Sequence, residues 1–300
     1  MNNRRAFTVV DLTGILAAAG LLIPLAAAMF GNQPDSAREA ARRKKDETQV
    51  RGIHQGFVVW AQNNKDSYPL PSKIDTKDYT VTELGADKDT TSNIYSMMVY
   101  NGTVSTEIFI SPVEASKSIE VFDKYEFDQP RKSAKPDKAI WDPAFSVDFT
   151  GGKKGAASYA HLQPSGGRIK RWSNTFKAEE KILSMRGPEV ASVVKNEDGS
   201  IKVTLANPKS VTIGMYEVST SWSGNTAFND NHVQFVKNAL ANGKTISPDS
   251  KLTTYKDAEG KSWPDIFCHD EQDDPKSVND YLGIFTRAGG KPADFKAIWD

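Results

Sequence analysis

Cysteine, histidine and an excess of charge of either sign are what this 300-residue sequence has least of. Cys268 is the single cysteine, which excludes an intramolecular disulfide and a thiolate metal cluster. The 38 basic residues balance the 38 acidic ones, whereas a nucleic-acid-binding protein normally carries a basic excess. The four histidines have no metal-site spacing, and the sequence contains no HExxH, no GxSxG and no phosphate-binding glycine-rich loop. We therefore expect a protein that is not an enzyme, binds no nucleic acid and carries no cofactor.

Long apolar runs are also scarce, because the mean hydropathy is −0.51 and only residues 12–30 depart strongly from it. Thr13 is the only polar side chain in that run. A helix of this length rises about 28 Å, close to the roughly 30 Å of a bilayer's hydrocarbon core. The run therefore predicts a transmembrane helix.

Three interpretations of the amino terminus are open. A basic start at Arg4 and Arg5, an apolar run and small residues near Ala28 are typical of a secretory signal peptide. The arginine pair followed by Phe7 also resembles a twin-arginine signal. Neither explains Asp11, since a carboxylate beside an apolar segment is costly and is usually paired and functional. The simplest alternative for Asp11 is an unpaired position in the headgroup layer.

The third interpretation accounts for Asp11. A basic leader, a small residue, Phe-Thr, two apolar residues, an acid and then about 20 apolar residues resemble the amino terminus of type IV pilins and type II secretion pseudopilins. The resemblance implies that a prepilin peptidase cleaves between Ala6 and Phe7, that Phe7 is then methylated, and that Asp11 acts in assembly. Where the family usually has glycine and glutamate, this chain has Ala6 and Asp11.

The physical role of Asp11 follows from its surroundings. Cleavage would leave a cationic α-amine on Phe7, and methylation keeps its charge. In lipid this cation and the Asp11 carboxylate are each costly alone and tolerable as a pair. An amine from a neighbouring subunit would set the register between helices, so self-assembly or packing with other pseudopilins is expected.

Residues 31–65 are expected to continue the helix. Ser36 and Glu39 have capping-box spacing, and the apolar residues recur every three or four positions. The apolar face predicts burial against a domain, and its members are Val50, Ile53, Phe57, Val58 and Ala61.

Basic residues are more numerous after the apolar run than before it, which by the positive-inside rule favours a cytoplasmic domain. Long domains cross regardless of charge, and the same helix also carries acidic residues. We therefore expect a single-pass protein of the bacterial inner membrane, with its domain in the periplasm or outside the cell. Residues 42–45 predict a solvated helix face rather than a nucleic-acid stripe.

Residues 66–300 predict one extracytoplasmic domain. The segments 191–208 and 226–236 are typical of hairpins, with turns at an Asp-Gly pair and at residues 229–231, and residues 106–112 predict a short strand. The expected fold class is α+β, with the long N-terminal helix packed on an antiparallel sheet. The expected organisation is a leader, a transmembrane helix, its amphipathic continuation and the domain, at residues 1–6, 7–30, 31–65 and 66–300.

Several segments of this domain resemble the planctomycete type of pilin-like protein. They read FISPVEASKSIEVFDKYEFDQ, IWDPAFSVDFTGG, SYAHLQP, ILSMRGPE and WSGNTAFNDNHVQF. Together with the amino terminus, they identify the chain as resembling a membrane-anchored structural protein, a pseudopilin or minor pilin of a type II secretion or type IV pilus-like apparatus.

One acidic loop is a candidate cation site. It contains Asp270, Glu271, Asp273 and Asp274, whose oxygens suit calcium, and type II pseudopilins bind calcium in a carboxy-terminal loop. The spacing and central glycine of an EF-hand are missing, and the alternative is a solvated acidic loop.

The rival function is an exported hydrolase or a ligand-binding protein with a conventional signal peptide or anchor. Its aromatic residues would line a glycan cleft, with Asp142, Asp148 and Asp230 as candidate paired carboxylates. His232 is either a ligand or base beside Asp230 or a hairpin-turn residue.

Overall fold

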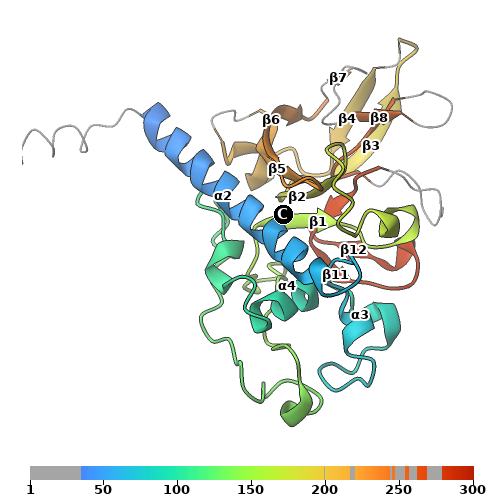
Figure 1. Cartoon of the computed structure of the whole chain (residues 1–300). Coiled ribbons are helices and arrows are strands. Elements are labelled where there is room, and N and C mark those ends of the chain that lie inside the picture. The colour runs from blue at the N-terminus through green and yellow to red at the C-terminus, as the bar shows by residue number, and fades with distance from the viewer. Residues whose placement is uncertain are drawn as a thin grey trace, which may run out of the picture. The chain divides into compact units, whose positions relative to one another are not determined.

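The computed structural model describes residues 35–300, except for 199, 217–219, 244, 247–253, 257–261 and 269–278. Residues 43–300 form one compact unit, shown in Figure 1. As expected, its fold is α+β, with a long helix packed on an antiparallel β-sheet.

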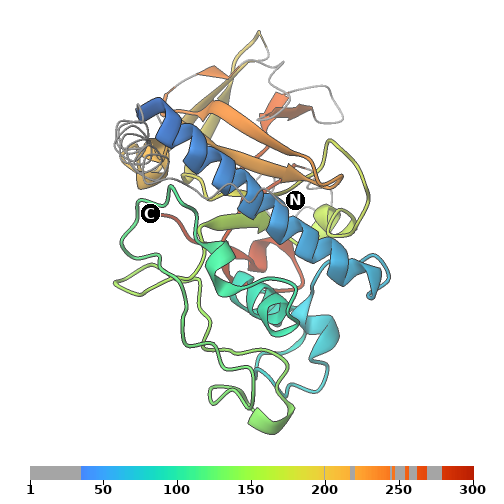
Figure 2. The same ribbon diagram turned by 60° about the vertical axis from the view of Figure 1, so that its left-hand side comes forward.

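Helix α2 (Asp35–Gln62) contributes one buried face to this unit. Val50, Ile53, Phe57 and Ala61 are fully buried, as their spacing predicts, and Val58 packs beside them half-buried. Figures 1 and 2 both show α2 lying across the strands of the main sheet. A long helix packed on the sheet is therefore confirmed over Asp35–Gln62.

The main sheet has five antiparallel strands in the order β10-β1-β2-β5-β6. The strands β1, β2 and β5 are buried at every position, as expected for strands covered on both faces. Asn231 turns the β5–β6 hairpin with a left-handed φ of 66°, which confirms the predicted turn at 229–231. The five strands are β1 (Tyr159–Leu162), β2 (Lys181–Met185), β5 (Trp222–Phe228), β6 (Val233–Leu240) and β10 (Leu282–Gly283).

Smaller sheets complete the β-structure. The predicted hairpin of residues 191–208 is confirmed, since Val193 pairs with Val203 and the Asn196 N–H donates to the Ser200 carbonyl at 2.9 Å. This hairpin and β7 make a three-stranded sheet, and two strand pairs lie elsewhere. Their strands are β3 (Val190–Lys195), β4 (Ile201–Leu205), β7 (Thr245–Ile246), β8 (Thr254–Lys256), β9 (Ser262–Pro264), β11 (Phe285–Arg287) and β12 (Lys296–Ala297).

The strand predicted at 106–112 is wrong, because this segment contains the 3₁₀ helix η2 (Thr106–Phe109). Thr106 and Phe109 are its buried residues, and a spacing of three places them on one side of a 3₁₀ turn. The remaining helices are α3 (Pro71–Ile74), η1 (Gly85–Lys88), α4 (Thr91–Tyr100), η3 (Pro136–Lys138), η4 (Gly166–Lys170), η5 (Val211–Gly214) and η6 (Pro292–Asp294).

Three tryptophans, Trp141, Trp172 and Trp222, are among the largest fully buried side chains. Each indole N–H has a buried or half-buried acceptor. Trp141 donates to Asn93 Oδ1 at 3.1 Å, Trp172 to the Pro69 carbonyl at 3.0 Å and Trp222 to the Arg186 carbonyl at 2.9 Å. Buried indoles with satisfied N–H groups stabilise a core. These three residues therefore do not line the glycan cleft considered above.

Candidate functional site

The residues predicted to act in processing and assembly, Ala6, Phe7 and Asp11, lie outside the described residues. The same holds for the acidic loop of Asp270, Glu271, Asp273 and Asp274. Within the described chain, no helix is long and apolar enough to cross a membrane. Nor do those residues include three or more His, Cys, Asp or Glu side chains grouped to hold a metal ion.

A buried polar contact joins Asp46 of α2 to the sheet and to the segments beside it. Asp46 is fully buried, and its Oδ1 accepts hydrogen bonds from Ser111 Oγ at 2.6 Å and from the Tyr159 hydroxyl at 2.7 Å. Its Oδ2 accepts from the Tyr216 hydroxyl and from Asn225 Nδ2, both at 2.7 Å. A carboxylate offers about four acceptor positions, and here four donors occupy them.

The electrostatics of this contact are unusual for a buried acid. Burial raises the pKa of Asp46 above its ordinary 3.8, and the four hydrogen bonds, all from neutral side chains, offset this in part. The donors come from β1, from β5 and from the segments that follow η2 and η5. A shift of α2 by one residue would rotate Asp46 by about 100°. The contact therefore fixes both the rotation and the axial position of the helix on the sheet.

His54, about two turns further along α2, makes a second polar contact. Its Nε2 lies 3.0 Å from the Tyr68 hydroxyl and its Nδ1 lies 3.0 Å from Asn231 Oδ1. Tyr68 in turn donates to Asn229, whose Nδ2 donates to Glu180 at 2.8 Å. Burial lowers the pKa of His54, so the imidazole is neutral at pH 7. This network connects α2 to the β5–β6 turn.

A buried ion cluster joins Lys181 at the start of β2 to Asp265 and Asp280. Lys181 Nζ bonds to Asp265 and lies 3.3 Å from Asp280, which also bonds to Arg171. Burial, with the nearby Asp265 carboxylate, raises the pKa of Asp280 to about 6. Two cations therefore balance two carboxylates, as in a structural ion-pair network.

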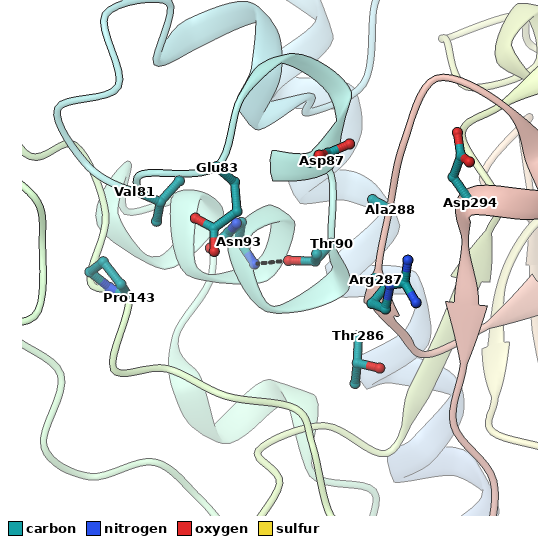
Figure 3. Close-up of a pocket in the computed structure, with 10 residues that line it drawn as sticks. All are labelled: Val81, Glu83, Asp87, Thr90, Asn93, Pro143, Thr286, Arg287, Ala288 and Asp294. Atoms are coloured by element: carbon teal, nitrogen blue, oxygen red, sulfur yellow. Dashed lines mark hydrogen bonds between the residues drawn. The ribbon is translucent and has the colours of Figure 1, made fainter.

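A pocket of about 560 Å³ lies between the 81–93 segment and β11. Figure 3 shows the residues that line it. Glu83 lies beside Asn93 in this view, and Arg287 extends from the strand. Asp87 and Asp294 add two more carboxylates to its wall. These four charged side chains are exposed, so the pocket offers both signs of charge to a ligand in water.

The acids considered for hydrolysis are each held by local donors. Asp142 is fully buried and accepts from the Ala144 N–H at 2.8 Å, whereas Asp148 bonds to Lys153 at 2.6 Å. Asp230 bonds to Nδ1 of His232 at 2.5 Å, within the β5–β6 turn. His232 therefore lies in the hairpin turn and also beside Asp230, as its two interpretations respectively expect.

Asp46 and His54 make buried polar contacts that the sequence analysis does not predict. Asp46 lies four residues before Val50 and in phase with the apolar face. His54 directly follows Ile53 on that face. Phase with the buried stripe was the available signal for both residues.

Comparisons of this chain with protein-family models, curated proteins and solved structures give no match.

Proposed function

We propose that this chain is a pilin-like structural protein of a bacterial inner membrane, a pseudopilin or minor pilin of a type II secretion or type IV pilus-like apparatus. Residues 7–30 would form its transmembrane helix, with the leader in the cytoplasm and the domain outside the membrane. Its partners would be a prepilin peptidase and neighbouring helices of its own kind. Its work would be assembly rather than catalysis.

The observation that carries this proposal is the order of residues at the amino terminus. Ala6 and Phe7 follow a basic leader, and Asp11 stands at the fifth position counted from Phe7, at the start of the apolar segment. A signal peptide explains the apolar run but gives no role to the carboxylate. A cationic α-amine on Phe7 gives it one, because the two charges neutralise each other in lipid.

The attachment of α2 gives the proposal a structural rationale. Assembly through a helix orients the domain only if the helix is fixed to that domain. Asp46 and His54 hold α2 through six hydrogen-bonded partners, counted as four at Asp46 and two at His54. Packing of neighbouring transmembrane helices would supply the attraction, and the Asp11 pair would supply the register.

The first test is the amino-terminal residue and the intact mass of the chain recovered from its native membranes. Methylated Phe7 is the expected result. A chain that begins near Met29 would identify a signal peptide, and an intact Met1 would identify a simple anchor. Either of these results would contradict the proposal.

The second test separates processing from assembly. Asp11→Ala should leave cleavage before Phe7 intact and abolish crosslinking between subunits in the membrane, since the amine loses its partner. Asp11→Glu is the matched control, because it keeps the charge and should keep the crosslinks. Assembly of Asp11→Ala at the level of the parent chain would remove Asp11 from the mechanism.

A further inference from the structure

A second pocket, of about 470 Å³, lies where four segments distant in the sequence meet. It takes residues from 70–73, 85–89, 164–169 and 289–290. Its volume falls within the range of roughly 300–1,000 Å³ that is typical of small-molecule sites. The charged side chains that line the pocket in Figure 3 are exposed, whereas two polar residues of this second pocket, Asp89 and Ser165, are buried.

Asp89 is the main buried acceptor of this pocket. Its side chain is 4% exposed, and its carboxylate accepts from the Ser72 N–H at 2.8 Å and from Ser72 Oγ at 2.7 Å. Among the residues that the structure describes, Ser72 supplies both donors, which leaves about two of the four acceptor positions open. Burial raises the pKa of Asp89 to about 6, so most of the carboxyl is ionised at pH 7.5.

Ser165 contributes a hydroxyl with no partner. It lines the same pocket, its Oγ is buried, and that atom makes no hydrogen bond among the described residues. A buried hydroxyl without a partner costs about 1–3 kcal/mol. The Ser165 Oγ is closed off from solvent, so a ligand gains that contribution only if the side chain turns to expose it. Lys73 adds an exposed ammonium group to the wall.

The rest of the wall is backbone and apolar surface. Gly85 and Gly166 adopt left-handed φ values of 51° and 57°, and Gly290 leaves open space where a Cβ would stand. Bare peptide edges of this kind let a ligand approach the main chain closely. Leu70 and Ile169 supply apolar surface beside them.

We propose that this pocket binds a neutral polyhydroxylated ligand of about one saccharide unit. Hydroxyl groups donate to Asp89 and accept from Lys73, while the C–H face of a sugar packs on the apolar surface. A carboxylate and an ammonium group at one site disfavour a ligand of single charge. A zwitterion would have to desolvate two charges, which costs more than desolvating hydroxyls.

This inference does not depend on the proposed function, and the fold supplies its controls. Asp87 and Asp89 lie two residues apart, yet Asp87 lines the pocket of Figure 3 and Asp89 lines this one. Gly214, on η5, resembles Gly290 in that an added Cβ would meet no atom within 4 Å. Asp87→Asn and Gly214→Phe are therefore matched controls for Asp89→Asn and Gly290→Phe.

The experiment is saturation-transfer NMR on the full-length chain at pH 7.5, in a detergent without a sugar headgroup. The probes are methyl α-D-glucoside, methyl α-D-mannoside, methyl β-D-galactoside and N-acetyl-D-glucosamine, with glycine and L-alanine as zwitterionic probes. At least one sugar should bind with a Kd of about 1 mM or tighter. Asp89→Asn and Gly290→Phe should each weaken that binding at least about tenfold, whereas both controls should leave it unchanged.

Three results would overturn the proposal. They are no transfer to any of the four sugars, binding of the zwitterions alone, and sugar binding that Gly290→Phe leaves unchanged. Thermal unfolding of each variant shows whether it is folded. If Asp89→Asn does not fold, Gly290→Phe still tests sugar binding in this pocket. The hydrogen bonds to the Asp89 carboxylate come from Ser72, so a substitution at Gly290 leaves them in place.

Discussion

Replacing Asp46 with alanine would remove the acceptor of four buried hydrogen bonds in one step. The donors are Ser111 Oγ, the Tyr159 and Tyr216 hydroxyls and Asn225 Nδ2, each 2.6–2.7 Å from the carboxylate. A buried donor without an acceptor costs about 1–3 kcal/mol, and the lower end of that range gives about 4 kcal/mol for the four donors. For a chain of this size that loss lowers Tm by roughly 10 °C.

Asp46→Asn should behave differently, since the donors on the two carboxylate oxygens are not alike. Oδ1 faces two hydroxyls, those of Ser111 and Tyr159, and a hydroxyl accepts as readily as it donates. An amide NH₂ at that position donates to both, while the amide oxygen keeps Tyr216 and Asn225. The variant also removes a buried charge, so we expect its free energy of unfolding to stay within about 1 kcal/mol of the parent value.

The assay is urea unfolding of both variants, followed by tryptophan fluorescence. Glu47→Ala is the control, because Glu47 makes only partly exposed ion pairs with Lys44 at 3.0 Å and Arg51 at 2.9 Å. Such pairs contribute about 0.2–1 kcal/mol. An Asp46→Ala variant as stable as Glu47→Ala would refute the role of Asp46 as an anchor. If Asp46→Asn lost as much stability as Asp46→Ala, the charge and not the set of hydrogen bonds would be what matters.

Three further predictions concern other buried groups. Burial raises the pKa of Asp89 from 3.8 to about 6, so the folded chain binds this proton more tightly than the unfolded chain does. Asp89 should therefore lower the free energy of unfolding by up to roughly 3 kcal/mol as the pH rises from about 4 to 6. Urea unfolding across that range should show a free energy that depends less on pH in Asp89→Asn than in the parent chain. Gly187→Ala should lower the free energy of unfolding by about 3 kcal/mol, because the alanine Cβ would lie 2.2 Å from Cε2 of the buried Phe267 ring. A Tm equal to that of the parent chain would contradict this expectation. Lys88→Met removes the cation that lies 2.9 Å from the buried Asp75 carboxylate, and it should lower the free energy of unfolding in urea by about 3 kcal/mol. An unchanged urea midpoint would mean that the three backbone N–H groups that donate to Asp75 stabilise its charge without Lys88.

Local patterns predicted the helix and two of the three β-segments. The stripe from Val50 to Ala61 has the period of a helix, and the two hairpins carry turn residues between β-branched runs. At residues 106–112 the composition suits a strand, but burial of Thr106 and Phe109 three residues apart favours a 3₁₀ turn. Tertiary packing overrides β-propensity in so short a segment.

The described sites were less accessible to sequence reasoning. The donors to Asp46 range from Ser111 to Asn225 along the chain, and the second pocket draws on residues from Leu70 to Gly290. Sheet topology brings them together, and no local spacing encodes it. The phase of Asp46 with Val50 reveals that the acid is buried, but the identity of its partners depends on which strands pair.

The pairing of β1 with β10 has a consequence for the order in which the domain folds. His161 is in register with Gly283, so the edge of the main sheet is completed by residues near the end of the chain. Contacts this distant in sequence slow folding, because the loop between the strands must be closed before the pair is stabilised. During synthesis β1 therefore keeps an unpaired edge until β10 has left the ribosome. An exposed strand edge is a template on which another chain can pair, so the nascent domain is most open to aggregation in that interval.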